Sequence, residues 1–144
     1  MGKNTDGDDN AAQEIVFVDD MPQLLAIAEG MLSKLGHPVR CFANPLDALA
    51  YIGKATSEIG LLITDQSMPA MTGLELIGAV RELPCELPSV LSTSVPEPAA
   101  VDDYLARGVN AILPKPFTMS ELEAVVRSQF EPDMAYAQSQ PSGC

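Results

Sequence analysis

Charged side chains stand at the ends of three short apolar runs of this chain. They are the carboxylates of Asp19, Asp20 and Asp65 and the ammonium of Lys115. Three carboxylates close together repel one another and need a cation, and their hard oxygen atoms suit Mg²⁺, with Mn²⁺ acceptable and Zn²⁺ disfavoured. A carboxylate beside Mg²⁺ and a lysine can attack phosphorus, because both cations neutralise the oxygens of the transferring phosphoryl group. The residue types therefore predict formation of an aspartyl phosphate.

Two hydroxyls extend this constellation. Thr93 and Ser94 follow another apolar run, and either hydroxyl could donate a hydrogen bond to a phosphoryl oxygen. Taken singly, these residues have plainer interpretations: an Asp-Asp pair is most often a solvated turn, and Lys115 alone is most often part of a surface ion pair. The joint placement of the charged groups at successive strand ends favours a site.

Composition limits the partners and the domain number. The 144 residues, 47% of them hydrophobic, suffice for one domain with a core. Eight Lys and Arg against twenty Asp and Glu give a net charge of −12, which disfavours direct binding of nucleic acid. We expect a disordered polar tail over residues 1–13, one domain over 14–131 and a second disordered tail over 132–144.

Cysteine usage and hydropathy indicate the compartment. The three cysteines lack metal-ligand spacing, and an odd number without a secretory signal is typical of reduced thiols in the cytosol. No apolar run approaches the ~20 residues that cross a bilayer. We therefore expect a cytoplasmic protein with no membrane partner.

Strand and helix signals alternate along the chain. Short apolar runs predict strands at 15–18, 39–42, 61–64, 90–91 and 111–113, and apolar residues at helical spacing follow each of them. Asn44 and Pro45 predict the start of a helix that buries Leu46, Leu49 and Ala50.

Two capping boxes and two glycines mark further helix boundaries. The capping boxes are expected at Thr72 with Glu75 and at Thr118 with Glu121, and Gly36 and Gly108 are natural helix ends. Five strands joined by helices predict an α/β fold, with a five-stranded parallel sheet that has helices on both faces. The site of such a fold lies beyond the carboxyl ends of the strands, where the strand order reverses. Both the topology and the chemistry therefore indicate the same edge of the sheet.

Over residues 14–131 the chain resembles the receiver domain of two-component response regulators. The resemblance rests on Val18-Asp19-Asp20, Ile63-Thr64-Asp65 with Met68-Pro69 and Gly73, Ser92-Thr93-Ser94, and Lys115-Pro116-Phe117. It implies a flavodoxin-like, doubly wound (βα)5 fold. It also implies a signal-transduction phosphoprotein of a phosphorelay, and not an enzyme.

The resemblance also implies a role for each site residue. Asp65 would be the phosphoacceptor. Asp19, Asp20, Asp65 and the backbone carbonyl of Ser67 would bind Mg²⁺. Thr93 and Lys115 would contact the phosphoryl group, and the Lys115-Pro116 bond resembles the family's cis peptide.

One position departs from the family pattern. Ile112 stands where the family often has a switching Tyr or Phe in the fifth strand, so the usual coupling between Thr93 and an aromatic ring is in question. Extra prolines at 96, 98 and 114 lie near the face where such domains usually meet partners.

The resemblance implies protein partners: a histidine kinase or phosphotransfer protein as donor, and a downstream protein as target. A homodimer is compatible with it, and the domain could be stand-alone or the C-terminal receiver of a hybrid histidine kinase. Two alternatives remain open. A Mg²⁺ phosphatase with an aspartyl nucleophile is disfavoured because Ser67 stands where such enzymes commonly carry an acid. A pseudo-receiver that only binds partners is the other.

Overall fold

The computed structural model describes residues 13–84, 86–94 and 98–130. Five strands lie in these ranges: β1 (Glu14–Val18), β2 (Val39–Phe42), β3 (Ile59–Asp65), β4 (Ser89–Ser94) and β5 (Ala111–Lys115). The α-helices are α3 (Pro22–Lys34), α4 (Pro45–Lys54), α5 (Gly73–Arg81), α6 (Pro98–Ala106) and α7 (Met119–Phe130). A short 3-10 helix, η1 (Thr56–Glu58), precedes β3. The expected tails fall outside the described residues, apart from Gln13.

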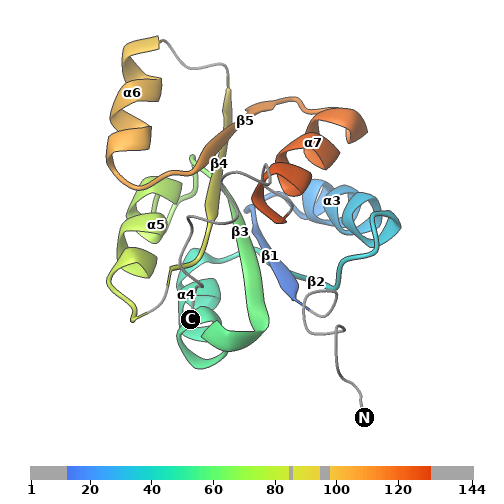
Figure 1. The fold of residues 1–144 in the computed structure, drawn as a ribbon, viewed down its shortest axis with the longest axis horizontal. Coiled ribbons are helices and arrows are strands. Elements are labelled where there is room, and N and C mark those ends of the chain that lie inside the picture. Colours follow the sequence, from blue (N-terminus) through green and yellow to red (C-terminus); the bar gives the residue numbers. More distant parts are fainter. Residues whose placement is uncertain (1–12, 85, 95–97, 131–144) are drawn as a thin grey trace.

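The strands form one parallel sheet in the order β2-β1-β3-β4-β5. The order reverses between β1 and β3, so these neighbouring strands deliver their carboxyl ends to the switch point of a doubly wound fold. Helices α3 and α7 cover one face of the sheet, and α4, α5 and α6 cover the other (Figure 1). This is the predicted α/β architecture.

Alternating strand residues divide the core between these two faces. Side chains on the α3 and α7 face include Ile15, Phe17, Ile63, Val90 and Leu113. Those on the opposite face include Val16, Val18, Leu62 and Leu91. All nine are at most 2% exposed, which explains why the strands are nearly continuous apolar runs.

The predicted helix boundaries are confirmed by their capping hydrogen bonds. The Leu46 amide donates to Asn44 Oδ1 at 2.8 Å. Thr72 with Glu75 and Thr118 with Glu121 each exchange the two bonds of a capping box.

The buried face of α4 differs from the predicted one. Leu46 is 51% exposed and Ala50 is also exposed, whereas Pro45, Ala48 and Ile52 are buried. The buried stripe is rotated by one residue because Ile52 enters the core and the small Ala48 lets the helix approach the sheet. The prediction for Leu46 and Ala50 is therefore wrong, and Leu49 is partly buried against the core.

The last residue of α7 packs near the amino end of β3. A methyl group on Gly60 would lie 2.9 Å from Gln13 Cβ and would also overlap the Phe130 ring. The same ring stacks on His37, with centroids 4.7 Å apart. The first and last described segments of the domain thus meet at the start of β3.

Among the described helices, none has the length and hydropathy that a bilayer crossing requires.

Candidate functional site

Lys115 joins two carboxylates at the carboxyl edge of the sheet. Its Nζ donates to Asp19 Oδ2 at 2.9 Å and to Asp65 Oδ1 at 2.8 Å. The carboxylate side chains are only 1% and 8% exposed, and the lysine side chain is 22% exposed. The three groups come from the ends of β1, β3 and β5, so the parallel sheet brings together residues that are far apart in the sequence.

Asp20 completes an acidic cluster beside this pair. Carboxylate oxygens of Asp19, Asp20 and Asp65 all lie within 4.8 Å of one another, and Asp20 is the most solvent-accessible of the three. Oxygens on opposite sides of a Mg²⁺ ion are about 4 Å apart at the usual bond length of about 2.0–2.1 Å. A donor set of three carboxylates, one of them open to solvent, therefore fits a hard divalent cation that keeps several waters.

Backbone contacts position the Asp19 carboxylate and the loop that follows Asp65. The Met21 amide donates to Asp19 Oδ1 at 2.9 Å. The loop after Asp65 folds back on itself, because the Gly73 amide donates to the Gln66 carbonyl at 3.0 Å. A side chain at position 73 would overlap the Asp65 backbone carbonyl, so this close approach requires glycine.

Burial and neighbouring charges shift the pKa values of Asp65 and Lys115. Burial raises the pKa of Asp65, and the neighbouring Asp19 charge adds to this rise, while the hydrogen bond from Lys115 offsets only part of it. For Lys115, burial is the largest influence and lowers the pKa, but hydrogen bonds to Asp65 and Asp19 outweigh it, so the pKa is raised overall. Lys115 therefore stays charged, and Asp65 is a more basic carboxylate than an exposed one.

The remaining predicted residues lie around this cluster. Thr93 is partly buried at the end of β4 opposite Pro114, and no hydrogen bond among the described residues joins its hydroxyl to the carboxylates. Ser67 is exposed in the loop after β3. Ile112 packs partly buried against the core on the α4, α5 and α6 face.

The Lys115-Pro116 peptide bond is cis, as the resemblance implied.

Two residues near the cluster had no predicted role. Gln66 accepts a hydrogen bond from the Leu74 amide at its Oε1, 2.9 Å away, and so anchors the start of α5. Ser92 is buried in β4 as the direct ladder partner of Asp65. Ser92 could have been noticed as a polar residue inside a buried strand, whereas Gln66 carries no signal in the sequence.

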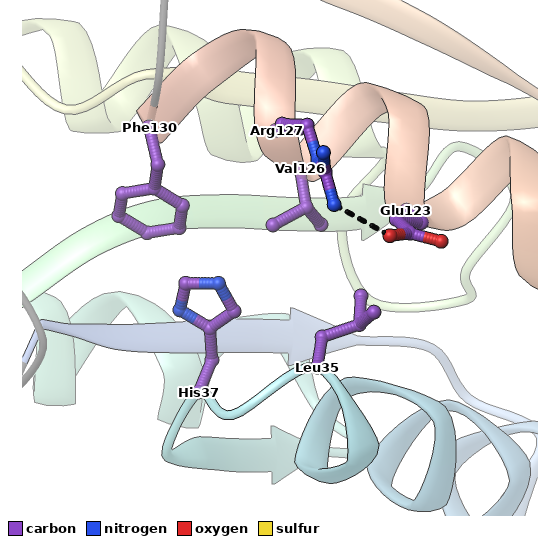
Figure 2. Close-up of a pocket in the computed structure, with 6 residues that line it drawn as sticks. All are labelled: Leu35, His37, Glu123, Val126, Arg127 and Phe130. Atoms are coloured by element: carbon purple, nitrogen blue, oxygen red, sulfur yellow. Dashed lines mark hydrogen bonds and ion pairs between the residues drawn. The ribbon is translucent and has the colours of Figure 1, made fainter.

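A small hollow of about 70 Å³ lies elsewhere on the molecule. Figure 2 shows His37 and Leu35 facing Phe130 and Val126 of α7, with Glu123 and Arg127 paired at its rim. The Phe130 ring packs at the start of β3, and Asp65 is the last residue of that strand. The hollow is therefore separate from the acidic cluster, which remains the candidate site.

Comparison with known proteins places the chain among signalling modules. Residues 15–127 match the family model of the response regulator receiver domain. The chain is 31% identical over 124 residues to the chemotaxis protein CheY of Pseudomonas aeruginosa. The alignment covers 82% of this chain and 96% of that protein. It is also 31% identical over 116 residues to the sensor histidine kinase AruS of the same species, covering 78% of this chain but only 11% of AruS.

A solved structure gives the same result. The chemotaxis protein CheY4 of Vibrio cholerae superposes with a TM-score of 0.72 at 27% identity, over 81% of this chain and 98% of that one. This chain therefore belongs to the family of response regulator receiver domains, the phosphoryl-accepting signalling modules of two-component systems.

Proposed function

We propose that Asp65 accepts a phosphoryl group from a phosphohistidine of a histidine kinase or phosphotransfer protein. The observation that carries this proposal is the single ammonium of Lys115 shared between Asp19 and Asp65. An ammonium held 2.8 Å from the acceptor carboxylate is placed to meet the charge of an incoming phosphoryl group.

The transfer follows from the groups at the site. An Asp65 carboxylate oxygen attacks phosphorus and forms a new P–O bond, while the P–N bond of the phosphohistidine breaks. The bonding electron pair stays on the imidazole nitrogen of the donor. Lys115 moves with its charge from the carboxylate toward the phosphoryl oxygens, and the Thr93 hydroxyl donates to one of them.

Three carboxylates and one carbonyl are proposed to bind the metal. Asp19, Asp20, Asp65 and the Ser67 carbonyl would hold Mg²⁺, with Mn²⁺ as a substitute. The ion supplies positive charge that offsets the acidic cluster and the phosphoryl oxygens. The spacing of the carboxylate oxygens, all within 4.8 Å, supports this assignment.

The phosphorylated domain would act by changing which protein it binds in the cytoplasm. We place the domain at residues 14–131. The relatives are compatible with a stand-alone receiver and with the receiver of a hybrid histidine kinase, because the chain matches nearly all of a CheY and about a tenth of a sensor kinase. Ile112 offers no aromatic ring, so the signal would pass from Thr93 to partners by another route. A pseudo-receiver that binds partners without phosphorylation is the alternative.

Intact mass spectrometry after incubation with acetyl phosphate and Mg²⁺ tests the proposal. One added phosphoryl group is expected, labile to hydroxylamine and absent in Asp65→Asn. Lys115→Ala should reduce the extent of labelling. A labelled Asp65→Asn variant would show that Asp65 is not the acceptor. A folded wild-type protein that accepts no phosphate, even from a set of phosphorylated phosphotransfer proteins, would favour the pseudo-receiver.

A further inference from the structure

Ser92 occupies the position beside Asp65 in the sheet. The two residues are direct ladder partners of β4 and β3, and the Gln66 amide donates to the Ser92 carbonyl at 3.1 Å. Neighbouring strands of a sheet lie about 4.8 Å apart, so the two side chains start from adjacent points. Their relative position is set by the backbone and does not depend on side-chain flexibility.

Both side chains also lie on the same face. Side chains alternate along a strand, and the residues two positions earlier, Ile63 and Val90, both belong to the core on the α3 and α7 face. The partner of Ser92 on its other side is Leu113, which is apolar. Asp65 is therefore the polar side chain that flanks Ser92 in its row of the sheet.

The Ser92 hydroxyl is buried without a hydrogen-bond partner. The residue is 1% exposed, and its Oγ makes no hydrogen bond within the part of the chain that the structure describes. A buried hydroxyl without a partner destabilises the folded state, which makes it unusual in a folded protein. Ser89, three residues earlier in the same strand and equally buried, has its hydroxyl bonded to the Leu87 carbonyl at 3.0 Å.

We propose that Ser92 is a positioning residue, whose hydroxyl donates a hydrogen bond to the Asp65 side chain as that side chain receives the phosphoryl group. The inference rests on the proposed function of Asp65 and extends it to a residue with no assigned role. In the unloaded site, Lys115 holds Asp65 Oδ1. When Lys115 turns toward the phosphoryl oxygens, the Asp65 side chain loses this donor, and Ser92 replaces it.

A hydrogen bond that begins to form while the phosphoryl group is being transferred stabilises the transition state as well as the loaded state. An interaction that is equally strong before and after transfer changes nothing, whereas one that appears along the reaction lowers its barrier. Rotation about the single χ1 torsion of serine suffices to redirect the hydroxyl, so no backbone movement is needed. The unpaired hydroxyl of the unloaded protein is then a donor available for the transfer.

The test compares Ser92→Ala with Ser89→Ala, a matched change of a buried serine in the same strand. With acetyl phosphate and Mg²⁺, Ser92→Ala should be labelled about tenfold more slowly than the wild type, which corresponds to about 1.4 kcal/mol. Its melting temperature should be equal to or higher than that of the wild type, because an unpaired hydroxyl is removed. Ser89→Ala should melt lower, since it loses a hydrogen bond, and should be labelled at the wild-type rate.

Rescue separates positioning from packing. Ser92→Thr keeps the hydroxyl and should recover most of the labelling rate. A Ser92→Ala protein labelled at the wild-type rate would overturn the inference while leaving the role of Asp65 intact. The inference would also be overturned if Ser92→Ala is labelled slowly, its melting temperature falls as well, and Ser92→Thr does not recover the labelling rate. A wild-type protein that is never labelled would overturn the proposed function of Asp65, and this inference with it.

Discussion

Replacing Lys115 by methionine removes the only described cation in contact with Asp19 and Asp65 while keeping a side chain of similar length. In metal-free buffer at neutral pH, two buried carboxylates would then face each other without compensation. Exposed ion pairs contribute about 0–1 kcal/mol, and breaking a buried pair costs about 3–5 kcal/mol. The carboxylates are 1% and 8% exposed and the lysine is 22% exposed, so this pair lies between those limits. We expect a loss of about 2–3 kcal/mol in the free energy of unfolding.

Urea unfolding followed by circular dichroism measures this loss. The experiment is run with a chelator and again with millimolar Mg²⁺. Because a bound ion supplies the missing positive charge and stabilises only the folded state, Mg²⁺ should restore most of the lost stability. Arg107→Met is the matched control, since it breaks an exposed helical pair with Asp103 at 3.5 Å and should change stability by less than about 0.5 kcal/mol.

The pH dependence gives a second check on the same variant. Burial raises the pKa of Asp65 above its ordinary value of 3.8, so in the folded state this carboxyl takes up a proton more readily than in the unfolded state. A protonated Asp65 needs no cation, so the defect of Lys115→Met should be largest above the folded-state pKa and should shrink as the pH falls through it. A variant as stable as the wild type in chelator at neutral pH would refute the reasoning, because the two carboxylates would then not depend on the ammonium.

Three further predictions concern single residues around the site and in the core. Gly73→Ala should lower the labelling rate of Asp65 and cost about 1–3 kcal/mol in urea unfolding, because the new methyl group overlaps the Asp65 backbone carbonyl; unchanged labelling and stability would contradict this contact. Cys41 should react with iodoacetamide about a hundredfold more slowly in the native than in the urea-unfolded protein at neutral pH, since burial raises its pKa from 9.0 to about 11. Because of the same pKa shift, the free energy of unfolding should fall as the pH rises from 9 to about 11. Equal alkylation rates of Cys41 in the native and unfolded protein, measured by peptide mass spectrometry, would argue against the raised pKa. Asn44→Ala should cost about 1 kcal/mol by removing the cap on the Leu46 amide, while Asn44→Asp, which keeps the capping oxygen, should not.

The apolar runs predicted the order and type of the strands because parallel strands buried on both faces need apolar side chains almost throughout. They predicted β4 only as residues 90–91, whereas the strand covers Ser89–Ser94. Buried serines within β4 concealed its length, because hydropathy does not reveal a polar residue inside a core.

The same limit applies to the side chains of helices and of the site. The buried stripe of α4 includes Ala48 and not Leu46, and only the packed structure shows which helix face meets the sheet. The approach of Lys115 to Asp19 and Asp65 was predicted from strand ends, since parallel strands share one carboxyl edge. The lack of a hydrogen-bond partner for the Ser92 hydroxyl could not be predicted, because it depends on the positions of all the polar atoms around it.

The contact of Gln13 and Phe130 at Gly60 determines how this domain can be joined to other chains. Gly60 and Asp65 are five residues apart along β3, which at about 3.3 Å per residue separates them by roughly 16 Å. Both ends of the folded unit are therefore on the edge away from Asp65 and next to each other. Such a unit can be inserted into a host protein as a cassette, or rejoined end to end with new termini opened in a loop, without crowding its reactive edge.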